Sequence, residues 1–130
     1  MIGLRFGVFS FVGAVGAVLQ VMLFGLFTKI LQLPPAAAMA IAVELVVLHN
    51  FVWHDRLTWR DRGAVSLRDR SLRLWRFHLA NGAVSLAGNT LLAYWLVQVL
   101  RFPVLWSAVL AIAVCAPLNF LAADRWVYRI

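Results

Sequence analysis

Residues 50–60 read NFVWHDRLTWR and residues 119–129 read NFLAADRWVYR, each directly after a long apolar run. With residue 50 placed on residue 119, an offset of 69, five of the eleven positions are identical: Asn50 with Asn119, Phe51 with Phe120, Asp55 with Asp124, Arg56 with Arg125 and Arg60 with Arg129. The same offset places Gly-Ala-Val at 13–15 on Gly-Ala-Val at 82–84. An internal repeat of this kind predicts two copies of one structural unit.

The composition is that of a membrane protein. Of the 130 residues, 64% are hydrophobic and 13% are charged, whereas soluble domains are about 45–50% apolar and about 25% charged. Because a charge inside the bilayer is costly, long uncharged runs predict membrane-spanning helices. Four such runs, of which the second is broken only by Glu44, place spans at about 6–28, 35–54, 77–100 and 103–123, with an Arg-rich loop at 55–76. We therefore predict an all-α integral membrane protein with one four-helix transmembrane domain over residues 1–130.

The distribution of cations predicts the orientation of these spans. The central loop carries seven arginines: Arg56, Arg60, Arg62, Arg68, Arg70, Arg73 and Arg76. The turns after spans one and three carry one cation each, Lys29 and Arg101. Positively charged loops stay in the cytoplasm, so the loop and both termini should face inward across the cell's inner (cytoplasmic) membrane. Ten of the twelve cations then face anionic lipid headgroups, which we expect as partners in place of nucleic acid.

Each half of the chain therefore reads as one helical hairpin that leaves the cytoplasm and returns to it. Both hairpins have the same direction, so the halves are parallel repeats related by an axis along the membrane normal. Tryptophans near the span ends are typical of interfacial aromatic belts. On the cytoplasmic side these are Trp53, Trp59, Trp75 and Trp126.

The repeated motif supplies the candidate headgroup-binding residues Asn50, Arg56, Asn119 and Arg125. An amide at the end of a span can hydrogen-bond across helices, and an arginine there can extend to the interface; both are structural roles. A guanidinium at headgroup depth can also hold a phosphate through its planar fork of donors. The duplication of these residues favours the second interpretation, in which two Arg-bearing corners flank one anionic headgroup.

Two further polar features lie inside the predicted spans. His78, Asn81, Ser85 and Asn89 are spaced by three, four and four residues, so an α-helix places them on one face. This polar stripe either bonds neighbouring helices or carries sugar hydroxyls across the bilayer. Glu44 is the lone acid within a span. It is either a proton-coupling site or a structural hydrogen-bonding group.

The sequence shows no pattern typical of a catalytic site or a metal site. His49 and His54 lack the spacing and the cysteine or carboxylate neighbours of a metal site. We find no Gly-rich phosphate loop, no paired metal-binding carboxylates and no nucleophile near an oriented base. We therefore expect no metal, no cofactor and no enzymatic activity.

The two motifs NFVWHDRLTW and PLNFLAADRWVY, closing spans two and four, resemble those of the GtrA-like family, which also occurs as the membrane domain of some dolichol-phosphate mannose synthases. The resemblance covers essentially the whole chain. It implies a role in cell-surface polysaccharide synthesis, as a flippase that moves a polyprenyl-phosphate-linked monosaccharide to the outer leaflet. By matching positions, it implies that Asn50, Arg56, Asn119 and Arg125 contact the headgroup.

Three functions compete on this basis. The leading hypothesis is a translocator of the sugar lipid, working as a homo-oligomer, most simply a dimer, because one chain offers few helices for a headgroup path. The second is a non-transporting anchor or accessory subunit that stabilises a partner glycosyltransferase through the Arg-rich loop. The third is a small proton-coupled multidrug exporter, in which Glu44 would exchange protons for cationic drugs.

Overall fold

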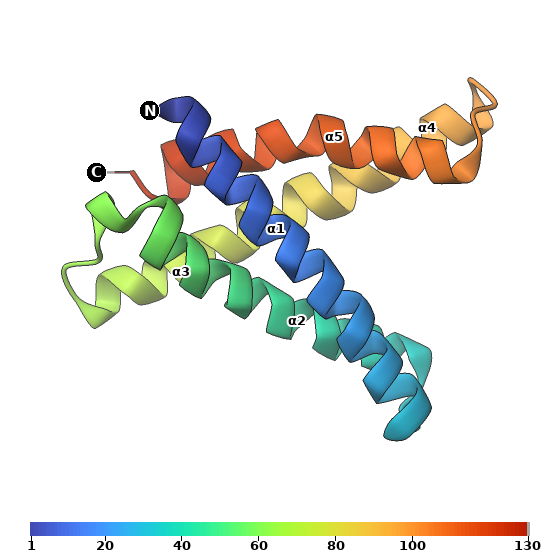
Figure 1. Ribbon diagram of the computed structural model, residues 1–130, viewed down its shortest axis with the longest axis horizontal. Coiled ribbons are helices and arrows are strands. Elements are labelled where there is room, and N and C mark those ends of the chain that lie inside the picture. Colours follow the sequence, from blue (N-terminus) through green and yellow to red (C-terminus); the bar gives the residue numbers. More distant parts are fainter. Residues whose placement is uncertain (130) are drawn as a thin grey trace. The chain divides into compact units, whose positions relative to one another are not determined.

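The protein is helical and divides into two compact units. The computed structural model describes residues 1–129, apart from the side chains of Leu86 and Val104, and this part contains helices and turns but no strand. One unit covers residues 1–63 and the other begins at residue 64 (Figure 1). We refer to them as hairpin one and hairpin two. Their boundary lies close to the middle of the chain, as the internal repeat predicts.

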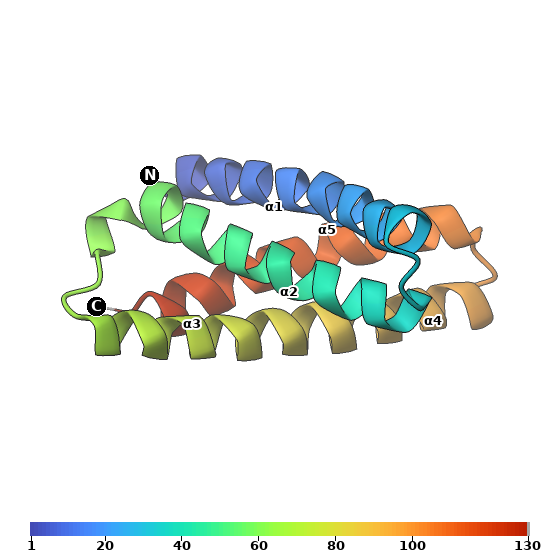
Figure 2. The ribbon, with the colours of Figure 1, turned by 90° about the horizontal axis from the view of Figure 1, so that it is seen from below.

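Hairpin one consists of two long helices joined by a short turn. Helix α1 (Ile2–Gly25) continues into the π-helical turn η1 (Leu26–Ile30), and α2 (Pro35–Trp53) continues into the π-helical turn η2 (His54–Thr58). A short 3-10 turn, η3 (Arg60–Arg62), follows. Helix α2 begins at Pro35 because the fixed φ of proline suits the first helical position. Figures 1 and 2 show α1 and α2 lying side by side.

Hairpin two pairs one very long helix with α5. Helix α3 (Leu67–Asn81), the π-helical segment η4 (Gly82–Gly88) and α4 (Asn89–Gln98) follow one another without a break (Figure 2). Helix α5 (Val104–Ala122) returns beside them and continues into η5 (Ala123–Val127). Ser66 caps α3, since its Oγ accepts a hydrogen bond from the Asp69 backbone N–H at 3.1 Å. The segment 55–76, predicted as a loop, is therefore largely helical: it contains most of η2, all of η3 and, from residue 67 onward, part of α3.

The turn that joins the two long helices of each hairpin, which we call the outer turn, has the same backbone conformation at matched positions of the two hairpins. Gln32 and Arg101 both adopt the left-handed region, with φ of 53° and 58°. The Leu33 N–H bonds the Phe27 carbonyl at 2.9 Å, and the Phe102 N–H bonds the Leu96 carbonyl at 3.0 Å. Every residue of hairpin two in these pairs lies 69 positions after its counterpart. The repeat thus includes turns whose sequences differ at most positions.

The helix pairs pack through matched lines of small residues. The buried positions of α2 and α5 recur every four residues, which places each set on one helix face. They are Ala38, Ala42 and Val46 in α2, and Ser107, Ala111 and Cys115 in α5. Such residues let helices approach closely inside a membrane. Gly88 extends this packing in hairpin two, because a Cβ there would lie 3.0 Å from the Cys115 sulfur.

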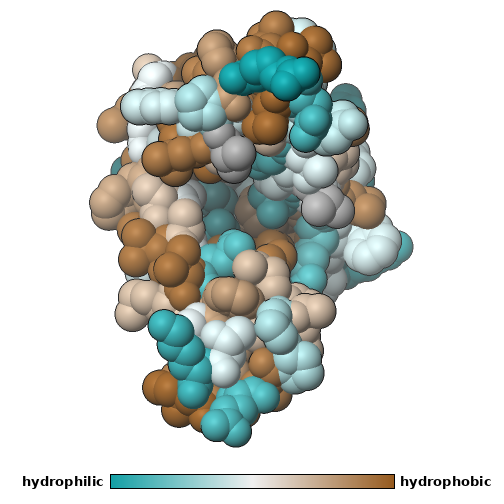
Figure 3. Space-filling view, turned by 90° about the vertical axis from the view of Figure 1, so that its right-hand side faces the viewer, coloured by the Kyte–Doolittle hydropathy of each residue, from teal (hydrophilic) through white to brown (hydrophobic). Residues whose placement is uncertain are grey.

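Three helical segments are long and apolar enough to cross a membrane: Ile2–Ile30, Pro35–Thr58 and Leu105–Val127. Large apolar side chains are exposed along them, among them Phe11, Val18 and Ile112. Figure 3 shows hydrophobic residues, coloured brown, exposed at the surface among hydrophilic residues in teal. Of the remaining predicted span, 77–100, residues 77–98 lie within the continuous helical run that links α3 to α4, which ends at Gln98.

Candidate functional site

The repeated motif forms a π-helical turn at the end of each second helix. In η2 the Trp59 N–H bonds the His54 carbonyl at 2.9 Å, and in η5 the Tyr128 N–H bonds the Ala123 carbonyl at 2.9 Å. Short π-helical turns inside α-helices are frequent at functional sites. The arginines Arg56 and Arg125 are exposed on these turns, whereas the preceding aspartates are half-buried. Each of these two π-helical turns therefore carries one exposed arginine in the same local position.

A fully buried aromatic side chain anchors each turn. Trp59 follows η2 and packs edge-on against Phe9 and His54, with ring centroids 5.9 Å and 5.6 Å apart. Tyr128 follows η5 and is equally buried. The sequence placed Trp59 in an interfacial belt, and this prediction is wrong because the indole fills the interior of hairpin one. Trp53, Trp75 and Trp126 are exposed, as a belt requires.

A cation from the N-terminal part of each hairpin lies near its anchored turn. In hairpin one, the Arg5 guanidinium pairs with Asp61 at 2.6 Å. In hairpin two, Arg73 is buried, lies 3.3 Å from Asp69 and stacks over the Tyr128 ring at 5.7 Å from its centroid. A buried arginine is stabilised only when its charge is paired. Sequence reasoning treated Arg73 as one of seven loop cations and missed this role.

The repeated asparagines occupy equivalent places against the neighbouring helix. Asn50 lies against Gly16, where any Cβ would clash with its amide group. Asn119 donates a hydrogen bond from Nδ2 to the Ser85 Oγ at 2.9 Å. Gly16 and Ser85 are themselves 69 positions apart, so each asparagine contacts the matched residue of its own hairpin. Sequence reasoning did not single out Gly16; its offset match with Ser85 is the signal that could have identified it.

The polar stripe of hairpin two is partly joined into one network. Ser85 Oγ donates to Asn81 Oδ1 at 3.5 Å and accepts from Asn119. His78 Nδ1 lies 3.1 Å from the Leu74 carbonyl oxygen, within its own helix. The Asn89 Oδ1 atom is buried and has no hydrogen-bond partner among the described residues. Segment η4 is π-helical where Ser85 lies, so the α-helical spacing assumed for the stripe does not hold there.

Glu44 lies on α2 of hairpin one. It is exposed, two residues from the buried Ala42 and Val46, and so faces away from the line that packs in hairpin one. His49 and His54 each have a side-chain neighbour: Asn50 Oδ1 at 3.1 Å and Thr58 Oγ1 at 3.0 Å. Among the described residues, no three histidine, cysteine or acidic side chains gather as metal ligands.

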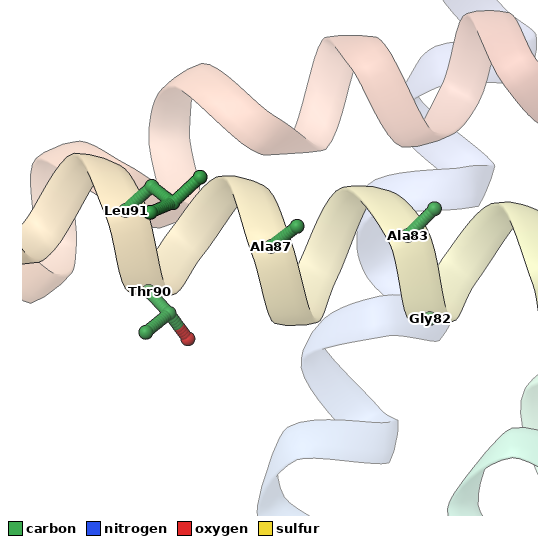
Figure 4. Close-up of a pocket in the computed structure, with 5 residues that line it drawn as sticks. All are labelled: Gly82, Ala83, Ala87, Thr90 and Leu91. Carbon is green, nitrogen blue, oxygen red and sulfur yellow. The ribbon is translucent and has the colours of Figure 1, made fainter.

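One shallow, open groove of about 610 Å³ runs along η4 and α4. Its lining is almost entirely apolar and consists of Gly82, Ala83, Ala87, Thr90 and Leu91 (Figure 4). Three of these residues have a hydrogen or a methyl group as side chain, which is why the helix surface is hollow there. None of the predicted headgroup residues lines this groove.

Fold and site together define a multi-pass helical membrane protein built from two repeated hairpins. Residues 8–128 match the family described as the GtrA/DPMS transmembrane domain. The chain belongs to this family, as its motifs indicated.

A curated relative shows where such a domain occurs in a larger protein. A dolichol-phosphate mannosyltransferase from Pyrococcus furiosus is 37% identical over 90 residues. The aligned region covers 68% of this chain but 23% of the relative. This chain therefore corresponds to a fraction of that protein. The family and this relative together connect the chain to lipid-linked sugar processes.

Proposed function

We propose that the chain flips a polyprenyl-phosphate-linked monosaccharide across the membrane for the synthesis of cell-surface glycans. One observation carries the proposal: both hairpins end in the same π-helical turn, with an exposed arginine, Arg56 or Arg125, one to two helical turns beyond a half-buried asparagine. A guanidinium in the interfacial region offers charge-assisted hydrogen bonds to a phosphate. Family membership supports the substrate class.

The proposed topology has four spans, with both termini and the Arg-rich segment in the cytoplasm of the inner membrane. The continuous helix over α3, η4 and α4 supplies the additional span, because it contains residues 77–98 of the apolar run 77–100. Under this topology Arg56 and Arg125 lie at the cytoplasmic surface, where a sugar lipid is loaded. We propose further that two copies of the chain assemble.

The chemistry we assign to the chain is non-covalent. Its residues bind the phosphate and accommodate the sugar, while the lipid tail stays in the bilayer. Bond formation to the sugar belongs in this scheme to a separate glycosyltransferase, which acts before flipping.

A second candidate function is that of an anchor for a glycosyltransferase. It is favoured by the Pyrococcus furiosus relative, a dolichol-phosphate mannosyltransferase that is much longer than the aligned segment. The helical Arg-rich stretch, with Arg68 and Arg70 exposed, offers a surface for such an enzyme. An anchor needs no path for the headgroup.

Reconstituted vesicles distinguish the two functions. The purified full chain is inserted into liposomes that contain a fluorescent short-chain mannosyl-phosphoryl-polyprenol, and externally added reductant reports how much lipid reaches the outer leaflet. We expect flipping by the wild type and an at least tenfold slower rate for Arg56→Gln and Arg125→Gln. Arg68→Gln, which removes an exposed arginine outside the repeated motif, serves as the control. No flipping by the wild type, together with stable co-purification of a glycosyltransferase, would establish the anchor.

A further inference from the structure

Two pairs of amide side chains occupy matched positions in the hairpins. Gln20 and Asn50 belong to hairpin one, and Asn89 and Asn119 lie 69 positions later in hairpin two. The pairs have the same place in the repeat but different surroundings. Their hydrogen bonds show which pair has an oxygen atom that could still accept a hydrogen bond.

The amides of hairpin one are engaged with their own hairpin. Asn50 Oδ1 lies 3.1 Å from His49 Nδ1, and the Gln20 Nε2 donates to the Met39 sulfur at 3.6 Å. Each of these two atoms therefore has a partner within its own hairpin. These two side chains therefore behave as packing groups of the helix pair.

The amides of hairpin two have an unused oxygen each. Asn119 donates from Nδ2 to Ser85, whose own hydroxyl donates onward to Asn81. This order fixes the Asn119 amide so that its oxygen points away from Ser85. Among the described residues, Asn119 Oδ1 and Asn89 Oδ1 are buried and have no hydrogen-bond partner. A buried carbonyl oxygen without a donor is destabilising, and most native proteins avoid it.

The two oxygens belong to adjacent turns of the same helix pair. Ser85, which holds Asn119, precedes Asn89 by four residues, or about 6 Å of helix. Gly88 packs against Cys115 of α5, so α5 runs beside the helix at this level. Both asparagine residues as a whole are only half-buried, so each buried oxygen lies close to a surface from which a ligand can approach.

We propose that Asn89 and Asn119 form a subsite that accepts hydrogen bonds from sugar hydroxyl groups, and that hairpin two alone provides it. The inference rests on the proposed function and narrows its substrate class. Two carbonyl acceptors match a neutral hexose, whose hydroxyls are donors. A sugar with a carboxylate brings a further acceptor and a negative charge, which this subsite does not complement.

The subsite is tested by binding of defined lipids to the purified full chain in detergent. The probes are a short-chain polyprenyl phosphate, its mannosyl derivative and its glucuronosyl derivative. We expect the wild type to bind the mannosyl probe about tenfold more tightly than the other two. Asn89→Leu should reduce this preference about three- to tenfold, as expected for the loss of one hydrogen bond, without weakening binding of the bare phosphate. Gln20→Leu, the matched change in hairpin one, should leave the preference unchanged.

Each outcome has a distinct meaning. Asn89→Leu removes a buried unsatisfied group, so its melting temperature should equal or exceed that of the wild type; if it fails to fold, Asn89→Ala takes its place. If the Asn89 variant keeps the wild-type preference for the mannosyl probe and still binds the bare phosphate, the subsite is overturned but the proposed function is not. Equal loss in Gln20→Leu and Asn89→Leu also overturns the subsite, because both hairpins would then contribute. A wild type that binds none of the probes overturns the proposed function as well.

Discussion

Hairpin one and hairpin two have the same backbone conformation at matched positions, but they differ in the polar side chains between their helices. Their outer turns and their terminal π-helical turns coincide position by position, with Trp59 matched by Tyr128 as the buried anchor. Where hairpin one has Gly16 against an asparagine, hairpin two has Ser85 and a hydrogen-bonded network. Duplication preserved the scaffold and allowed the polar content of one copy to diverge. The scaffold therefore shows what insertion and folding require, and the divergent residues indicate where the two copies have different roles.

The largest expected effect comes from removing the anchor that both hairpins share. Trp59→Ala should destabilise the protein by about 3–5 kcal/mol, because a fully buried indole is lost and a cavity remains. Tyr128→Ala should have a similar effect. Trp53→Ala, at an exposed position next to η2, is the matched control and should change stability by less than about 1 kcal/mol. Unfolding in mixed micelles measures all three, and equal effects at residues 53 and 59 would show that no anchor exists.

The next prediction concerns the contact between Gly16 and Asn50. Gly16→Ala should destabilise the protein by about 1–3 kcal/mol, since the added methyl group overlaps the amide. Gly13→Ala, where a Cβ meets nothing within 4 Å, should be neutral or stabilising by up to about 1 kcal/mol. The same unfolding assay compares the two. In the double variant Gly16→Ala/Asn50→Ala the loss should be largely relieved; additive effects would mean that the two residues do not interact.

An effect of similar size is expected from the network of hairpin two. Ser85→Gly makes position 85 like its counterpart Gly16 and removes the hydrogen bonds to Asn119 and Asn81. We expect a loss of about 0.5–1.5 kcal/mol per bond, in addition to about 1 kcal/mol for glycine within a helix. Ser85→Ala separates these two contributions. If Ser85→Ala is as stable as the wild type, the network contributes nothing to folding.

The smallest effect lies in the outer turns and should be equal in both hairpins. Gln32 and Arg101 have a positive φ, which is unfavourable for a residue with a side chain but not for glycine. Gln32→Gly and Arg101→Gly should therefore each stabilise the protein by up to about 1 kcal/mol. Leu31→Gly, at a residue with negative φ, should destabilise it instead. Melting temperatures measured in one detergent reveal these small shifts. Opposite signs for Gln32→Gly and Arg101→Gly would show that the two turns are not equivalent.

Much of the fold was predictable because charge and repetition are strong signals in an apolar chain. The absence of charges located the apolar runs, and Pro34-Pro35 marked the start of α2. The repeat in the motif predicted two units of like structure. The π-helical turns were not predictable, since the side-chain pattern that produces an α-helix also permits one inserted residue. The helical start at Leu67 was missed because a charged segment was read only for its charge.

Most residues of the candidate site were predicted from the sequence, but the contacts between them were not. Asn50, Asn119 and Ser85 were identified, but only tertiary structure shows that each asparagine contacts the matched partner of its own hairpin. Trp59 and Arg73 were assigned to the interface because residue type favours that location, and packing places both in the interior. The roles of Arg56, Arg125 and Glu44 remain predictions. Replacement of Glu44 by Gln tests the exporter hypothesis, which requires its ionisation.

The central claim is that both hairpins insert in the same direction. Leu57 and Trp126 are matched, exposed residues of η2 and η5, and Gln32 and Arg101 are matched residues of the outer turns. Single cysteines at these four positions, in a Cys115→Ala background, are labelled with an impermeant maleimide in intact cells and in inverted vesicles. We predict labelling of positions 57 and 126 only in inverted vesicles, and of positions 32 and 101 only in cells. Labelling of 57 and 126 from opposite sides would contradict the parallel repeat and the function built on it.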